Sequence, residues 1–421
     1  MLQTIQLLPG VTLRCATVQH FKQGCLSLQF LRPMRREEAA VNALIPAVLL
    51  RGTVHRPDLR ALTLHLDDLY GASVGELVRR VSDYQTMGLA CGFIDDRYTL
   101  SGDRVLEPMI ELVRELLLEP VMEGEGFSRE FIESEKRNLI ATIESQRNDK
   151  RAYTATQMIK KMCAADSFGI PRLGEKEQVE AIDPVGAYQH YRRVLEESPL
   201  EIFYVGSEDP QKVAKLLKAA LKDIPRDPIT LPDHTPFCDG GGGRYTEVMD
   251  VAQGKLSMGF LTPITNRQKD FITMQVFNTI FGAGMTSKLF MNIREKQSLC
   301  YSIGSGYYGS KGIMTVSAGI DFAMEEQVTR EVLHQLEECQ KGNITLQELK
   351  AAKEADLSAL RSIYDTPGGI ESYESGAAIG KVAFTLEEYC RGVEEVTLEQ
   401  IVEAAKTLTL HTTYFLKGVE Q

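Results

Sequence analysis

The sequence predicts an α+β protein made of two copies of one domain, each a mostly antiparallel sheet with helices packed on one face. The segment QGCLSLQFLRP at 23–33 returns as QGKLSMGFLTP at 253–263, a constant offset of 230 residues. In each half the expected strands are grouped apart from runs of helices, which is typical of α+β folds. A segment rich in Pro and Gly at 225–244 separates the halves, as a linker does.

The expected elements come in the same order in both halves. Two strands are followed by two helices, two more strands, long amphipathic helices and a late strand. In the first half these are 11–18 and 26–31, 37–50 and 57–70, 73–81 and 86–93, 107–118 and 129–146, and 200–207. In the second half they are 246–251 and 256–261, 268–281 and 286–297, 301–308 and 313–320, and a late strand at 411–418. The repeat predicts a first domain at 1–224, a linker at 225–244 and a second domain at 245–421.

The composition is that of a globular protein of two or three domains, with 421 residues, 43% of them hydrophobic and 25% charged. A net charge of −11 argues against a nucleic-acid or membrane partner. We expect no signal peptide, because no basic region precedes an apolar run, and no segment has the apolar length of a membrane span. The eight cysteines form no C-x-x-C pair, which favours free thiols in the cytoplasm.

The stretch 281–306 holds the candidate site of the second half. Thr286 or Ser287 is expected to cap a helix whose apolar positions (Leu289, Phe290, Ile293) recur at helical spacing. Arg294 at the helix end and Tyr301 at the next strand could direct two hydrogen-bond donors to one place. Such donors suit a peptide carbonyl and its developing negative charge. The alternative is a surface ion pair of Arg294 with Glu295 and a half-buried core tyrosine.

The pattern G-x-G-M-T-S-K-L-F-x-x-I-R-E-K-x-x-L-x-Y-S in this stretch resembles the second-domain signature of the pitrilysin/insulinase family of zinc peptidases, the inverzincins. The resemblance extends more weakly over nearly the whole chain. It implies that Arg294 and Tyr301 belong to the substrate-binding side of an active site and act from the domain opposite the metal.

The same resemblance implies that the metal site is lost. Active members carry H-x-x-E-H, in which two His bind zinc and the Glu activates water. Here the matching stretch reads ALIPAVLLRGT at 43–53, and Gly52-Thr53 fixes its register. The two His positions are then Ala43 and Ala47, the base position is Pro46, and the third ligand position is Thr142, seven residues after a retained family residue, Glu135. No metal or other cofactor is therefore expected.

Three functions follow from this reading. The first is a non-catalytic subunit that binds peptide and completes, in trans, the active site of a zinc-bearing homologue. The narrower resemblance is to bacterial inactive-homologue subunits, some of them linked with the aminopentanol modification of elongation factor P. The second is a stand-alone peptide-binding or scaffold protein without chemistry, and the third a hydrolase with an unrecognised site. A homodimer stays open beside the heterodimer.

Overall fold

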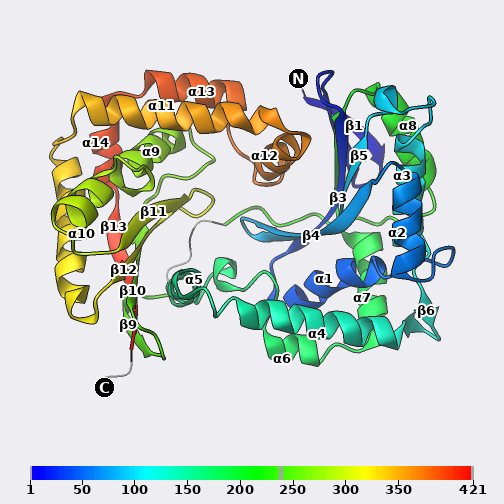
Figure 1. Cartoon of the computed structure of the whole chain (residues 1–421), viewed down its shortest axis with the longest axis horizontal. Coiled ribbons are helices and arrows are strands. Elements are labelled where there is room, and N and C mark those ends of the chain that lie inside the picture. The colour runs from blue at the N-terminus through cyan, green and yellow to red at the C-terminus, as the bar shows by residue number, and fades with distance from the viewer. Residues whose placement is uncertain (1, 236, 238–239, 419–421) are drawn as a thin grey trace. The chain divides into compact units, whose positions relative to one another are not determined.

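The computed structural model describes residues 2–235, 237 and 240–418, so Pro236, Cys238 and Asp239 of the expected linker lie outside the described residues. The chain forms two compact units. The first consists of 1–144, 170–234 and 363–376, and the second of 145–169, 235–362 and 377–421. Each unit therefore contains one segment from the other half of the chain, and Figure 1 labels their elements. The domain ranges expected from the sequence stay a prediction.

The first unit is built on a six-stranded sheet in the order β1-β2-β8-β3-β5-β4. Its only parallel pair among the named strands is β2 with β8, and the remaining pairs are antiparallel. The strands are β1 Leu2–Leu8, β2 Val11–Thr17, β3 Gln23–Pro33, β4 Ser73–Val81, β5 Tyr84–Ile94 and β8 Leu200–Gly206. A short hairpin pairs β6 Met122–Glu123 with β7 Gly126–Phe127.

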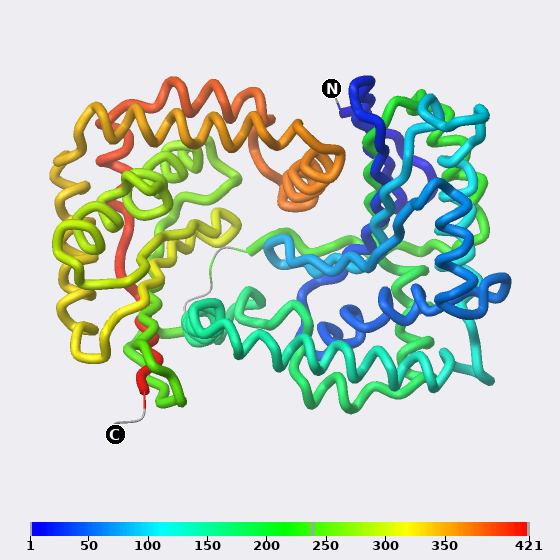
Figure 2. The backbone as a smooth tube through the Cα atoms, in the orientation of Figure 1, coloured from blue at the N-terminus to red at the C-terminus, as the bar shows by residue number. Residues whose placement is uncertain are grey.

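The second unit repeats this topology with five strands in the order β11-β12-β10-β13-β9. The strands are β9 Gly243–Val248, β10 Gly254–Leu261, β11 Ser302–Tyr308, β12 Ile313–Ile320 and β13 Thr409–Lys417. In each unit the last strand in the chain (β8 or β13) pairs antiparallel with β3 or β10. On its other side it pairs parallel with β2 or β9. Figure 2 shows this in the red trace of β13, which runs within a sheet otherwise coloured green to yellow. The predicted α+β duplication is confirmed.

Helices cover one face of each sheet. In the first unit the apolar side chains of β3 and β5, such as Leu28 and Leu89, share one core with α3 and α8. The first-half helices are α1 Arg36–Leu49, α2 Leu59–Asp68, α3 Leu106–Leu118, α4 Arg129–Ser145, α5 Lys150–Met162, α6 Lys176–Glu180, α7 Pro184–Glu197 and α8 Pro210–Leu221. The second-half helices are α9 Asp270–Asn278, α10 Glu325–Gln340, α11 Leu346–Ser362, α12 Pro367–Ile379, α13 Leu386–Glu395 and α14 Leu398–Lys406. No helix among the described residues has the length and apolar character of a membrane span.

The other face of the first sheet is covered by α12, from the second half of the chain. Its Glu371 is 3% exposed and accepts hydrogen bonds from Ser27 Oγ (2.6 Å) and Gln29 Nε2 (3.0 Å) on β3. Arg79 on β4 donates to both carboxylate oxygens of Glu371, at 3.0 and 2.9 Å. Because a buried carboxylate is costly unless it is paired, this set of contacts fixes α12 on the sheet.

In the second unit the corresponding cover is α5, from the first half of the chain, and it is apolar. Met158 and Met162 are fully buried with Ile313 and Tyr414. A Cβ atom at Gly259 on β10 would lie 2.5 Å from Met162 Sδ and 2.7 Å from Met158 Sδ, so only glycine fits there. Gly259 stands 230 residues after Gln29, so the repeat uses equivalent positions for opposite chemistry.

Several expected elements need correction. The strand expected at 246–251 is β9 at Gly243–Val248, and β1 was not expected at all. The helix expected at 286–297 is a π-helix at Leu289–Lys296, and the helix expected at 268–281 ends in a second π segment at Thr279–Ala283. Wide turns of this kind often occur at functional sites, and no propensity rule predicts them. Pro46 lies inside α1 without ending it.

The polar cover of the first sheet can be tested with Glu371→Ala. We expect the free energy of unfolding of the first unit to fall by about 2–4 kcal/mol, because Ser27, Gln29 and Arg79 lose their common acceptor. Urea denaturation measures this change. The matched control is Glu374→Ala on the same helix, which removes one hydrogen bond from Tyr364. It should cost about 1 kcal/mol or less. Equal losses in the two variants would contradict the role of Glu371.

Candidate functional site

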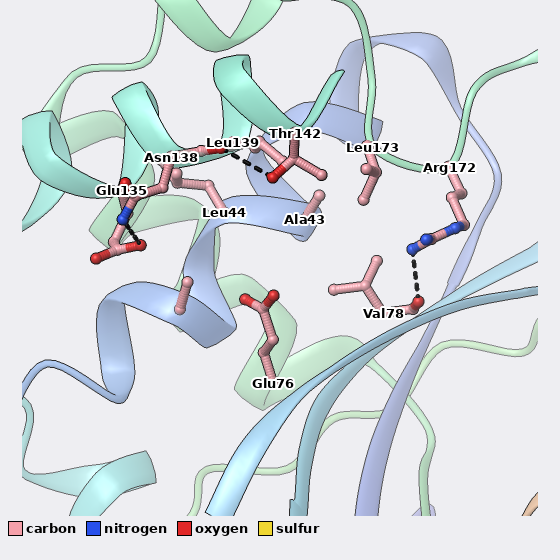
Figure 3. Close-up of a pocket in the computed structure, with 11 residues that line it drawn as sticks. Ala43, Leu44, Glu76, Val78, Glu135, Asn138, Leu139, Thr142, Arg172 and Leu173 are labelled. Atoms are coloured by element: carbon pink, nitrogen blue, oxygen red, sulfur yellow. Dashed lines mark hydrogen bonds between the residues drawn. The ribbon is translucent and has the colours of Figure 1, made fainter. Parts of the chain in front are cut away.

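The positions matched to the lost metal site lie together in the first unit. Ala43 and Ala47 on α1 and Thr142 on α4 line one cavity of about 210 Å³. Figure 3 shows them with the other lining residues, which are Leu44, Glu76, Val78, Glu135, Asn138, Leu139, Arg172 and Leu173. Pro46 is buried within α1 and does not line the cavity. The two alanines are four residues apart, so they lie on one face of the helix.

The retained Glu135 is held by neighbours in its own unit. It is 8% exposed, and its carboxylate accepts from Arg51 Nη1 (3.3 Å) and Asn138 Nδ2 (3.0 Å). The Arg51 guanidinium also lies 5.4 Å from the centre of the Phe131 ring. Thr142 Oγ1 donates to the carbonyl of Asn138 one turn earlier, at 2.9 Å. Glu135 therefore ties α4 to Arg51, just beyond the C-cap of α1.

Two charged residues of the cavity were not predicted from the sequence. Burial, and then the nearby charge of Glu135, raises the pKa of Glu76, while Arg172 opposes the shift. Arg172 Nη1 donates to the carbonyl of Val78 at 3.0 Å, on the edge strand β4. Strand alternation places Glu76 and Val78 on one face and could have pointed to Glu76. Arg172 lies in a loop that carries no pattern of its own.

The side chains of this cavity do not fit a zinc ion. Structural and catalytic zinc sites need at least three His, Cys or carboxylate ligands. The cavity offers two carboxylates, and Arg51 is paired with one of them. Within the described ranges, no group of three or more His, Cys, Asp and Glu side chains is placed to hold a metal ion.

The cysteines offer no strong nucleophile in the part of the chain that the structure describes. Five of the seven described cysteines are buried. Burial raises the pKa of the Cys15, Cys25 and Cys339 thiols to about 12, and that of Cys300 to about 11. Reactive cysteines have a lowered pKa. Cys238 lies outside the described residues.

Arg294 lies in the last turn of the π-helix Leu289–Lys296, whose Leu289 and Ile293 are fully buried. Its guanidinium is 4.6 Å from the centre of the Phe290 ring, and Nε is 3.7 Å from Glu295 Oε1. The side chain of Arg294 is 40% exposed. The π turn and the buried face fix the base of this side chain and leave its charged end open to solvent.

Tyr301 precedes β11 and is 60% exposed, so it is not the half-buried core tyrosine of the alternative interpretation. Its backbone N–H donates to Gly319 O (2.9 Å), and its hydroxyl donates to Asp321 Oδ1 (3.0 Å). The hydrogen bond to Asp321 raises the pKa of Tyr301. Arg294 and Tyr301 thus contact different carboxylates, and both present polar groups to solvent.

Comparison with known proteins agrees with this geometry. The family described as "Peptidase M16 inactive domain" matches residues 187–355. The "Probable inactive metalloprotease YmfF" of Bacillus subtilis strain 168 is 29% identical over 411 residues, covering 98% of this chain and 96% of that protein. The crystal structure of a conserved protein from Enterococcus faecalis V583 has a TM-score of 0.92 and 26% identity, covering 100% of this chain and 99% of that chain. A peptidase M16 inactive domain from Pseudomonas fluorescens shares the fold, with a TM-score of 0.80, 18% identity and coverage of 100% and 98%.

Fold and site together define a peptidase-like, non-catalytic protein in which the ligand positions of a metal site carry other side chains. These matches support a degenerate member of the pitrilysin-type, or M16, peptidase family. The resemblance stated from the sequence is confirmed.

The lost ligand set can be rebuilt as a test of the register. We expect Ala43→His, Ala47→His and Thr142→Glu together to bind about one zinc per chain, because all three positions line one cavity. Elemental analysis of the dialysed protein measures this. The control is the pair Ala43→His and Ala47→His alone, which should bind zinc at least about tenfold more weakly. Equal zinc content in the two variants would refute the assignment of Thr142.

A second test concerns Asp356 on α11, which accepts from Thr279 Oγ1 at 2.7 Å at the start of the π segment before Arg294. Burial raises the pKa of Asp356 from 3.8 to about 6, so the folded chain holds this proton more tightly than the unfolded chain. The contribution of Asp356 to stability is therefore lost as pH rises from about 4 to about 6.

We expect Asp356→Asn to raise the free energy of unfolding by about 1 kcal/mol at pH 7.5 and to remove that pH dependence. The amide oxygen can still accept from Thr279. Urea titrations at pH 4, 5, 6 and 7.5 provide the comparison. An unchanged pH profile would show that Asp356 titrates normally.

Proposed function

We propose that the chain is the non-catalytic subunit of a heterodimer with a zinc-bearing homologous peptidase. In this complex it binds peptide, and Arg294 and Tyr301 complete the partner's active site in trans. The observation that carries the proposal is the contrast between the two units. The cavity of the first unit holds Ala43, Ala47 and Thr142 at the ligand positions, whereas the second unit keeps exposed donors at Arg294 and Tyr301.

The contacts of Arg294 support a role beyond structure. A residue that clasps a helix to a strand would pair with a buried carboxylate on another element. Arg294 instead neighbours Glu295, the next residue in the chain, at 3.7 Å and half exposed. Exposed pairs of this kind contribute about 0–1 kcal/mol to stability. The guanidinium can exchange this weak contact for a peptide carbonyl at small cost.

The repeat supports the same conclusion. By the strand pairing, Ser302 and Gly304 of β11 correspond to Ser73 and Gly75 of β4, so Tyr301 corresponds to Ala72. A residue that served only the framework of the fold would be expected in both copies. The phenol belongs to the second copy alone, which favours a role in ligand binding.

The proposal places the complex in the cytoplasm, which the scattered spacing of the eight cysteines, with no C-x-x-C pair, supports. A homodimer is an alternative assembly, and a stand-alone binding protein is the alternative function. The link with elongation factor P rests on the sequence resemblance alone. Affinity purification from the native cell tests these points together, because the proposal requires a stoichiometric homologue that carries H-x-x-E-H.

The trans role is tested by reconstituting the chain with that homologue and measuring peptide turnover. Arg294→Ala and Tyr301→Phe should each lower kcat by about 10²–10³, because each removes a donor to the developing oxyanion. The matched control is Tyr308→Phe, a phenol 45% exposed at the other end of β11, which should leave kcat unchanged. Unchanged turnover in an intact complex would reject the role, and loss of assembly would favour a structural clasp.

A further inference from the structure

One face of the second sheet carries a block of small polar residues beneath the start of α5. Across the sheet, Lys255 on β10 pairs with Gly319 on β12, which pairs with Ser302 on β11. The next set of residues on this face is paired in the same way: Ser257 on β10 pairs with Ser317 on β12, which pairs with Gly304 on β11. Directly paired residues project to the same face of a sheet. The small side chains therefore leave room above the backbone for longer groups to reach over it.

Two cations reach over this block. A Cβ atom at Gly304 would lie 3.4 Å from Arg151 Nη2, so the guanidinium from the first turn of α5 lies directly above this glycine. A Cβ atom at Gly319 would lie 3.4 Å from Lys255 Nζ and 3.1 Å from Ser302 Oγ. Burial and the charge of Arg151 lower the pKa of Lys255. The two cations are thus close enough to repel each other.

Within the part of the chain that the structure describes, neither cation has an anionic partner. Arg151 and Lys255 form no ion pair there, and Lys255 Nζ donates to the neutral Gln253. The charge of Asp149 acts on Lys255, but this carboxylate caps α5 by accepting from the backbone N–H groups of Arg151 and Ala152. Ser257 Oγ is fully buried and has no hydrogen-bond partner. Two unpaired cations beside hydroxyl donors are suited to an anion.

The cations are not part of the framework of the repeat. Small residues recur in the first sheet, where Ser73 and Gly75 occupy the corresponding places on β4. The position 230 residues before Lys255 is Cys25, which cannot supply a positive charge. The positive charge is therefore a feature of the second unit, as the phenol of Tyr301 is.

We propose that Arg151 and Lys255 form a binding subsite for a carboxylate of the peptide that the chain holds. This inference rests on the proposed function and deepens it. β11 is the edge strand of its sheet, and Tyr301 and Ser302 project to opposite faces of that edge. The side chains of an extended peptide laid along the edge also alternate, so successive residues, at about 3.3–3.6 Å per residue, reach Tyr301 on one face and the subsite on the other. The carboxylate is that of an acidic side chain or of the peptide C terminus.

The test uses the full chain and three peptides of Gly, Ser and Ala that carry a neutral BODIPY dye, and their binding is measured by fluorescence anisotropy. The first contains one Glu and has an amidated C terminus, the second has Gln in place of Glu, and the third has Gln and a free C-terminal carboxylate. We expect the Glu peptide or the free-acid peptide to bind at least about tenfold more tightly than the uncharged one. Whichever binds tightly identifies the source of the carboxylate.

Arg151→Gln and Lys255→Gln should each remove this difference. The matched control is Lys350→Gln, which removes a charge from a side chain that is 77% exposed on α11 of the same unit and should preserve the difference. Arg151→Glu should reverse the preference toward a peptide that carries Lys. Arg151→Lys should retain the preference for the carboxylate if the site needs charge alone. Circular dichroism and melting curves establish that each variant is folded.

Equal affinity for the three peptides would overturn the subsite, as would a carboxylate preference that survives both Gln variants. Failure of all three peptides to bind at concentrations up to about 1 mM, an affinity weaker than about −4 kcal/mol, would overturn it as well. These outcomes are separate from the turnover test of Arg294 and Tyr301. If the Arg294 and Tyr301 variants lose turnover but the peptides show no carboxylate preference, the subsite is rejected and the trans role remains.

Discussion

In each unit the helices from the same half of the chain leave one face of the sheet open, and the structure depends on how that face is covered. In the first unit a single buried carboxylate, Glu371, joins β3 and β4 to a helix from the second half of the chain. In the second unit two methionines of a first-half helix pack on Gly259. The charged contact is directional and fixes one geometry, whereas methionine adapts to irregular surfaces. Each compact unit is complete only when it includes this segment.

Much of the fold could be predicted because a strand in a half-buried sheet carries a local pattern of apolar residues in the sequence. The expected strands 73–81 and 313–320 are β4 and β12 without correction. β1 was missed because its sequence, LQTIQLL, alternates weakly and lies at the edge of the sheet. The π turns before Arg294 were missed because apolar spacing of three and four residues suits an α-helix and a π-helix alike. No local pattern in the sequence shows which sheet a helix covers. The sequence therefore could not predict that α5 covers the sheet of the second unit and α12 that of the first.

The candidate sites divide in the same way. Ala43, Ala47 and Thr142 could be placed from a motif whose register a Gly-Thr pair fixes, and they line one cavity. Arg172 could not be placed, because its role comes from a loop that folds back to a strand carbonyl. Arg151 and Lys255 are 104 residues apart and meet only through the register of three strands and the start of a helix. Charges that matter through such long-range pairing leave no pattern within one stretch of sequence.

The use of segment 363–376 in the first unit has a consequence for synthesis on the ribosome. Translation proceeds from the N terminus, and domains usually fold as they emerge. Here the strands of the first sheet are made by residue 206, but the helix that buries Ser27 and Gln29 appears about 160 residues later. For that interval the nascent chain carries an uncovered sheet face with unpaired polar groups and the free guanidinium of Arg79. The first unit can therefore complete its fold only after the second half of the chain has been synthesised as far as α12.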